Sequence, residues 1–214
     1  MSGVRDLAAG FEKGSGHKVV VDFVGIPQQA EKINTDAPGD LVVNFLPTFD
    51  ELVKNGKVVA GTVAEFARAG NGVAVKAGAP KPDIGTPETL KAAVLAAKSV
   101  GYSREGASGV AFARVLERLG IADQVRAKYK DTGTKAGEML AAGEIDLAAA
   151  QIPELMAVPG VEVVGPLPAE LQTVTIFSVG LATGVPEPGA AKALIEFLSG
   201  PRATPVYKAK GLGG

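Results

Sequence analysis

Short apolar runs that alternate with helix-like segments constrain the fold of this chain more than any other feature of its sequence. Runs such as 19–24 (VVVDFV) and 41–45 (LVVNF) have the length of strands. Segments of helical periodicity separate the runs, and glycine or proline marks the junctions. Because this alternation is typical of helices that cover a sheet, the sequence predicts an α/β fold. Apolar runs without polar alternation favour parallel strands that are buried on both faces.

The same patterns assign most of the remaining chain. Helices are predicted at 4–13, 27–35, from Pro47 onward, and at 87–97, 109–119, 122–128, 135–142, 187–199 and 201–210. Further strands are predicted at 72–75, 99–102, 129–131, 146–150 and 161–164, and an extended segment at 173–183.

Two segments indicate that the chain leaves one lobe and later returns to it. The breaker-rich segment 78–82 (GAPKP) follows a strand, and 173–183 could carry the chain back. This order predicts a discontinuous lobe I at 1–74 and 176–214, and a lobe II at 78–172. Hinge crossings are expected at 75–77 and 173–175.

Composition excludes several kinds of protein. The 214 residues are 46% hydrophobic and carry a net charge of −1, so no basic surface is expected for nucleic acid. No stretch approaches the roughly 20 apolar residues of a membrane-spanning helix. The chain has no cysteine and one histidine, His17, which is expected in a solvated loop. No metal site, cofactor or catalytic residue is therefore predicted.

The first residues, MSGVRD, lack the apolar core of a signal peptide. Two locations stay open: the periplasm if a leader has been removed or omitted, and the cytoplasm if the chain as written is complete.

Several segments, taken in order, resemble the type II periplasmic solute-binding proteins of ABC transporters, close to the molybdate-binding branch. They are 11–19 (FEKGSGHKV), 37–42 (APGDLV), 49–58 (FDELVKNGKV), 106–109 (GASG), 115–121, 163–172 and 190–211 with the closing KAKGL. The resemblance implies a two-lobed fold with a mixed sheet in each lobe, and a non-enzyme that captures a small anion or solute between the lobes. It also implies an ABC permease as partner.

Strand-to-helix turns supply the candidate ligand-binding residues. Helix N-termini present unpaired N–H groups and a partial positive charge, so they bind anions without lysine or arginine. The turns at 25–28, 45–48, 103–109 and 132–134 have this character. Ser2 lies just ahead of the first predicted helix, where the family has a loop that leads into that helix. The predicted ligand-binding residues are Ser2, Gly25, Thr48, Ser103, Ser108, Thr134 and Gln151.

Some of these residues have a second interpretation. Ser108 and Thr134 could be simple helix N-caps, and Gln151 could bond local backbone instead of a ligand. Tyr102, at a strand end, is expected in the core in preference to a cleft wall.

The chain also departs from the family pattern. The family's first strand is absent, which would leave 19–24 and 41–45 facing a gap with unpaired backbone groups. Lobe I is therefore expected to pair these strands directly or to borrow a strand from another chain, which would give a homodimer by strand exchange. In addition, Glu105 places a carboxylate near the expected anion site and argues against molybdate as the ligand.

Two alternatives stay open beside the importer component. One is a cytoplasmic ligand sensor or orphan binding domain on the same fold. The other is an enzyme on the same scaffold, although Val110 replaces the second glycine that a G-x-S-x-G nucleophile turn around Ser108 would need.

Overall fold

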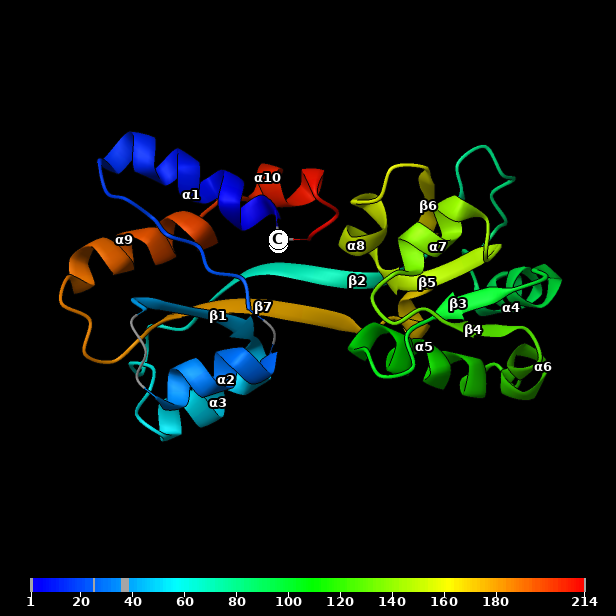
Figure 1. The fold of residues 1–214 in the computed structure, drawn as a ribbon, viewed down its shortest axis with the longest axis horizontal. Helices are drawn as coiled ribbons and strands as arrows, with labels where there is room; N and C mark the ends of the chain where they lie inside the picture. Colours follow the sequence, from blue (N-terminus) through cyan, green and yellow to red (C-terminus); the bar gives the residue numbers. More distant parts are fainter. Residues whose placement is uncertain (1, 25, 36–38, 214) are drawn as a thin grey trace. The chain divides into compact units, whose positions relative to one another are not determined.

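A computed structural model describes residues 2–24, 26–35 and 39–213, and it confirms that helices and strands alternate along the chain (Figure 1). The helices are α1 (Ser2–Ser15), α2 (Ile26–Asn34), α3 (Leu46–Lys54), α4 (Pro87–Ala96), α5 (Ala107–Arg118), α6 (Ala122–Arg126), α7 (Ala136–Ala142), α8 (Ile152–Met156), α9 (Pro188–Ser199) and α10 (Thr204–Ala209). The strands are β1 (Leu41–Phe45), β2 (Ala64–Lys76), β3 (Val100–Tyr102), β4 (Tyr129–Asp131), β5 (Leu147–Gln151), β6 (Val161–Pro166) and β7 (Val174–Leu181). No helix of the described chain is both long and apolar enough to cross a bilayer.

The chain divides into two compact units. Unit 1 comprises residues 1–68 and 175–214, and unit 2 comprises 69–174. The first boundary lies within β2, earlier than the crossing predicted at 75–77. The chain passes from unit 1 to unit 2 along the single strand β2, which continues without a break from Ala64 to Lys76. The glycine- and proline-rich segment 78–82 follows this strand and already belongs to unit 2.

The strands of unit 1 are ordered β1-β7-β2, and helices cover both of their faces (Figure 1). Helices α1, α9 and α10 lie on one face. There the rings of Phe11 and Phe197 pack edge to face, with their centres 5.5 Å apart. On the other face, Phe49 of α3 packs with Val42 and Val58. Strand β1 runs antiparallel to β7, so the expectation of a parallel partner for 41–45 was wrong. The returning segment 174–181 enters the sheet in the opposite direction and occupies that position.

Residues 16–24 belong to no helix or strand, so the predicted strand at 19–24 was wrong. Side chains hold the segment instead: Val19 N donates to Glu12 Oε1 at 2.7 Å, Asp22 pairs with Lys32, and the Arg5 guanidinium lies 4.6 Å from the centre of the Phe23 ring. Two of its apolar side chains are solvent-exposed, Val20 at 81% and Phe23 at 44%, and its other valines are half-buried. The segment has strand-like composition, but among the described residues no strand pairs with it.

The expected direct pairing between 19–24 and 41–45 is likewise not found. Ala182 N donates to Asp40 O, so Asp40 faces β7 with its backbone groups. In an antiparallel pair every second residue does so, and the backbone groups of Val43 and Phe45 therefore point away from β7. Gln29 Nε2 donates to Val43 O at 2.8 Å, and Asn44 Oδ1 accepts from Phe45 N at 2.7 Å. Side chains therefore satisfy backbone groups that were expected to need a strand. Strand exchange with another chain stays a prediction.

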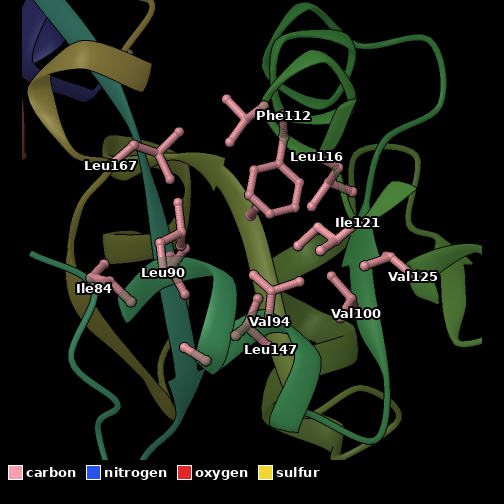
Figure 2. Packing of buried hydrophobic residues seen from close by; sticks show 14 of the residues in the cluster. Ile84, Leu90, Val94, Val100, Phe112, Leu116, Ile121, Val125, Leu147 and Leu167 are labelled. Carbon is pink, nitrogen blue, oxygen red and sulfur yellow. The ribbon is translucent and has the colours of Figure 1, made fainter. Parts of the chain in front are cut away.

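Unit 2 is built on a sheet in the order β2-β5-β3-β4, with β6 also paired to β2. Strand β3 is parallel to both β4 and β5, whereas β2 is antiparallel to β5 and β6, so the sheet is mixed as predicted. Because side chains alternate along a strand, β5 contributes residues to a hydrophobic core on each face of the sheet. Leu147 and Ala149 face the core of α4, α5 and α6 (Figure 2), and Ala148 and Ala150 face the core of α7 and α8.

Candidate functional site

The carboxyl ends of β3, β4 and β5 enclose a pocket of about 220 Å³ in unit 2, which we call the strand-end pocket. The three strands are parallel, so their carboxyl ends meet at one edge of the sheet, where α/β proteins place their ligand crevices. Its polar wall consists of Ser103, Ser108, Thr132, Thr134, Glu138 and Glu154. Small apolar residues of β5, α7 and α8 form the rest of the wall, and no lysine or arginine lines it as described.

The start of α5 supplies unpaired amides to this wall. Its N-cap is Gly106, which has no side chain to accept a bond, and the first intrahelical bond runs from Val110 N to Gly106 O at 2.9 Å. The backbone N–H groups of residues 107–109 precede that bond and have no partner within the helix. They give this end of α5 a partial positive charge, with the Ser108 hydroxyl among them.

A close contact fixes α5 against the loop that follows β3. A Cβ atom built on Gly109 would lie 1.8 Å from Ser103 O, so only glycine fits there. Ser103 Oγ in turn accepts from Gly106 N at 2.9 Å and closes the turn into the helix. The motif GASG is thus explained by backbone approach, and it brings Ser103 and Ser108 to the same wall.

Asp131, at the end of β4, joins two loops of the pocket. Its Oδ1 accepts from Arg104 N at 3.0 Å and from Gly133 N at 3.2 Å. These backbone hydrogen bonds, the one from Arg104 foremost, lower the pKa of the Asp131 carboxyl. The ionised carboxylate therefore holds the turn 132–134 close to the loop after β3.

Thr132 carries a buried hydroxyl without a hydrogen-bond partner in the described part of the chain. The residue is only 5% exposed and lines the strand-end pocket. Its backbone is satisfied, because Thr132 N donates to Tyr102 O and Thr132 O accepts from Lys135 N. A buried hydroxyl almost always has a partner in a folded protein, so Thr132 is an exception. The protein covers its hydroxyl oxygen, so this oxygen lies beneath the pocket wall and does not face the solute space.

Glu154 brings a carboxylate to the same pocket. It is the third residue of α8, and part of it remains solvent-exposed. The surrounding protein removes water from the carboxyl, and this desolvation raises its pKa. A hydrogen bond from the Gln151 backbone opposes that rise. Glu105, the carboxylate expected near the anion site, is exposed and is not part of the pocket wall.

The pocket brings together Ser103, Ser108 and Thr134 of the predicted ligand-binding residues. Neither Ser108 nor Thr134 is an N-cap, since Gly106 and Lys135 occupy those positions, so the capping interpretation was wrong. Gln151 is the N-cap residue of α8 and follows the pocket residue Ala150.

The other predicted residues are not among the described residues that line this pocket. Thr48 belongs to unit 1, where its hydroxyl donates to Asn44 Oδ1 at 3.4 Å. Ser2 begins α1, and its side chain lies outside the described part, as does Gly25. Tyr102 packs on Phe112 at 5.4 Å and joins the core, as expected.

Sequence reasoning missed Thr132, Glu138 and Glu154 as pocket residues. Thr132 was recognised only as part of a strand-to-helix turn, and its own position directly after β4 was the available signal. Glu154 gave no such signal, because an acidic residue in the first turn of a helix is ordinary.

A larger hollow of about 440 Å³ runs along α5, beside Val110, Arg114, Arg118 and Leu171. It lies on a helix flank and not at strand ends, and its wall lacks the converging hydroxyls of the strand-end pocket. Binding sites in α/β proteins are distinguished by a few convergent polar groups more than by size, so the smaller pocket is the better candidate. In the described ranges no group of three or more acidic or histidine side chains could hold a metal ion.

Comparison with known proteins gives concordant matches along the whole chain. The sequence model of a family described as "Bacterial extracellular solute-binding protein" matches residues 3–213. An aconitate isomerase of Pseudomonas sp. is 31% identical over 221 residues, which cover 99% of this chain and 83% of the relative. The molybdate-binding protein ModA of Azotobacter vinelandii is 28% identical over 219 residues, 98% of this chain and 84% of the relative.

Solved structures share the fold. A substrate-binding domain assigned to a molybdenum ABC transporter of Clostridium difficile superimposes with a TM-score of 0.86 at 14% identity, over 99% of this chain and 93% of that one. The periplasmic molybdate-binding protein of Azotobacter vinelandii gives 0.74 at 21% identity, over 99% and 94%. At these identities the likeness concerns the fold and not the ligand.

Proposed function

The chain belongs to the bacterial extracellular solute-binding proteins, and from that premise we propose that it captures a small anionic solute in the strand-end pocket for an ABC importer. The resemblance to type II periplasmic solute-binding proteins of the molybdate-binding kind is confirmed, and so is the α/β fold that it implied. The importer, the permease partner and an extracytoplasmic location are parts of the proposal.

One observation carries this proposal: Ser108 at the start of α5, together with the hydroxyl residues Ser103 and Thr134, lines the same small pocket. Hydrogen-bond donors that are fixed by the fold stabilise an anion without the desolvation of a lysine or arginine side chain.

A thermal-shift and calorimetric screen tests the proposal. The panel contains molybdate, tungstate, sulfate, phosphate and small organic acids. A ligand at 100 times its Kd adds about 2.7 kcal/mol to the free energy of unfolding. We expect at least one anion to raise the melting temperature and Ser108→Ala to weaken its binding.

The control for that variant is Ser199→Ala, because the Ser199 hydroxyl bonds to Ile195 O within α9 of unit 1. Binding of no anion at all, or equal losses in both variants, would contradict the proposal.

A second candidate function is the isomerisation of a small polycarboxylate. It is favoured by the 31% identity to an aconitate isomerase over nearly the whole chain, together with the raised pKa of Glu154 in the pocket. A group that takes a proton from one carbon and returns it to another works best when its pKa lies near the working pH.

Proton NMR of the protein incubated with cis- or trans-aconitate would detect interconversion directly. This function predicts turnover that Glu154→Gln abolishes and that Glu105→Gln leaves unchanged. Absence of turnover at high protein concentration would leave solute binding alone.

A further inference from the structure

The strand-end pocket has two chemically different sides, and this difference bears on the identity of its solute. Hydrogen-bond donors come from the start of α5 and from the hydroxyls of Ser108 and Thr134. Acceptors come from α8 and α7, through the carboxylates of Glu154 and Glu138. A solute that satisfies both sides must carry an anionic group and a hydrogen-bond donor.

A fully deprotonated tetrahedral oxyanion meets only half of this requirement. Its oxygens suit the amides and hydroxyls, but they offer no proton to Glu154, and the two negative charges repel each other in a partly desolvated pocket. The pocket wall as described contains no lysine or arginine that would offset this repulsion. The carboxylate of Glu154 therefore disfavours such an ion.

The volume of the pocket points the same way. About 220 Å³ holds roughly seven water molecules, at about 30 Å³ for each. A tetrahedral oxyanion, with a central atom and its oxygens, would leave part of that space empty. A short organic acid with several carbon atoms would fill it, and the apolar lining residues Ala150 and Leu155 suit its carbon chain.

We infer that the solute of the strand-end pocket is a small hydroxycarboxylic acid. Its carboxylate lies at the start of α5 and accepts from the Ser108 hydroxyl, and its own hydroxyl donates to Glu154. This inference rests on the proposed function, because it assumes that the strand-end pocket holds an anion, and it adds the class of that anion.

Pairs of acids that differ by one hydroxyl group test the inference on the unmodified protein. Calorimetric titrations compare malate with succinate, lactate with propionate and citrate with tricarballylate, with molybdate as the oxyanion. A hydrogen bond to a charged group corresponds to a factor of about ten or more in Kd. We expect the hydroxy acid of at least one pair to bind about tenfold more tightly than its partner and than molybdate.

Glu154→Met then assigns the effect to one residue, because methionine has similar length but neither charge nor strong acceptor. In this variant the preference for the hydroxy acid should fall to less than about threefold, and molybdate should bind more tightly than in the wild type. Glu105→Met is the matched control, since Glu105 is an exposed carboxylate outside the pocket wall, and it should change neither quantity. Thermal unfolding without ligand checks that both variants are folded.

The outcomes separate this inference from the proposed function. Equal binding within every pair, or tighter binding of molybdate by the wild type, overturns the hydroxy-acid inference and leaves anion binding intact. A hydroxyl preference that survives in Glu154→Met also overturns it. If none of these anions binds, the proposed function fails and the inference fails with it.

Discussion

Gln172 pairs with the backbone of Asn71 as a neighbouring strand would. Its Oε1 accepts from Asn71 N at 2.8 Å and its Nε2 donates to Asn71 O at 2.9 Å. Asn71 is only 4% exposed, so water cannot readily replace these bonds. A side-chain amide thus completes the pairing of β2 just before the chain enters β7.

This pairing predicts that Gln172→Leu destabilises the protein. The substitution keeps a similar size but leaves Asn71 N without its partner, and a buried unsatisfied amide costs about 1–3 kcal/mol. Urea unfolding of wild type and variant measures the loss. Gln29→Leu is the comparison in unit 1, where a glutamine also bonds backbone, at Val43 O. A loss below about 0.5 kcal/mol in Gln172→Leu would contradict the role assigned to it.

Thr132→Val should raise stability and leave binding nearly unchanged. In the protein without ligand, removal of an unpartnered buried hydroxyl should raise the free energy of unfolding by up to about 1–2 kcal/mol. Affinity for the solute should stay the same, because the protein covers the hydroxyl oxygen. Chemical unfolding and calorimetry measure the two quantities on the same samples.

The matched control is Thr86→Val, because the Thr86 hydroxyl caps α4 by accepting from Thr89 N at 3.2 Å. That variant should lose about 1 kcal/mol of stability and keep its affinity. If Thr132→Val behaved like Thr86→Val, the Thr132 hydroxyl would not be an orphan.

Gly109→Ala should disrupt the strand-end pocket. The added methyl group would overlap Ser103 O, a backbone atom that moves only if the loop after β3 moves. Overpacking of this kind costs about 1–3 kcal/mol or more, and we expect loss of ligand binding with it. Gly14→Ala is the control, since open space surrounds that position in α1, and it should stabilise by up to about 1 kcal/mol.

The acid stability of the protein should depend on Asp131. Its carboxyl has a pKa below the ordinary value of 3.8 in the folded state, so its stabilising contribution is fully present above pH 3.8. That contribution is lost as the pH falls through the lower folded-state pKa. The difference in melting temperature between wild type and Asp131→Ala should therefore be larger at pH 7 than at pH 2.

Asp123→Ala serves as control, because Asp123 makes only an exposed ion pair with Arg126. A difference between wild type and Asp131→Ala that grows as the pH falls would contradict the assigned role.

The order of helices and strands could be predicted from the sequence because local signals mark their ends. Pro47 in the first turn of α3 and Pro87 at the start of α4 mark helix starts, and the apolar run 41–45 marks β1. The run 64–71 at the start of β2 was missed, because Gly70 and the charged Glu65 and Arg68 obscure the strand pattern.

The error at 19–24 has a different cause. Val19–Val24 has the β-branched composition of a strand, but a strand also needs a neighbour, and composition cannot report whether one exists. The pocket was predictable in part for a related reason. Ser103 follows β3 directly and Ser108 lies in the first turn of the next helix, so both belong to one strand-to-helix turn. Glu154 comes from α8, far along the sequence, and no local pattern connects it to that turn.

The alanines of β5 have a consequence for how readily this protein could change its cargo. Ala149 and Ala150 form the floor of the strand-end pocket, and each also belongs to a core on its own side of the sheet. A bulkier residue at either position would reduce the volume available to a solute and would also overpack a helix layer. Substitutions in the loops around the pocket do not disturb these cores, so we expect new ligand specificities to arise in the loops first.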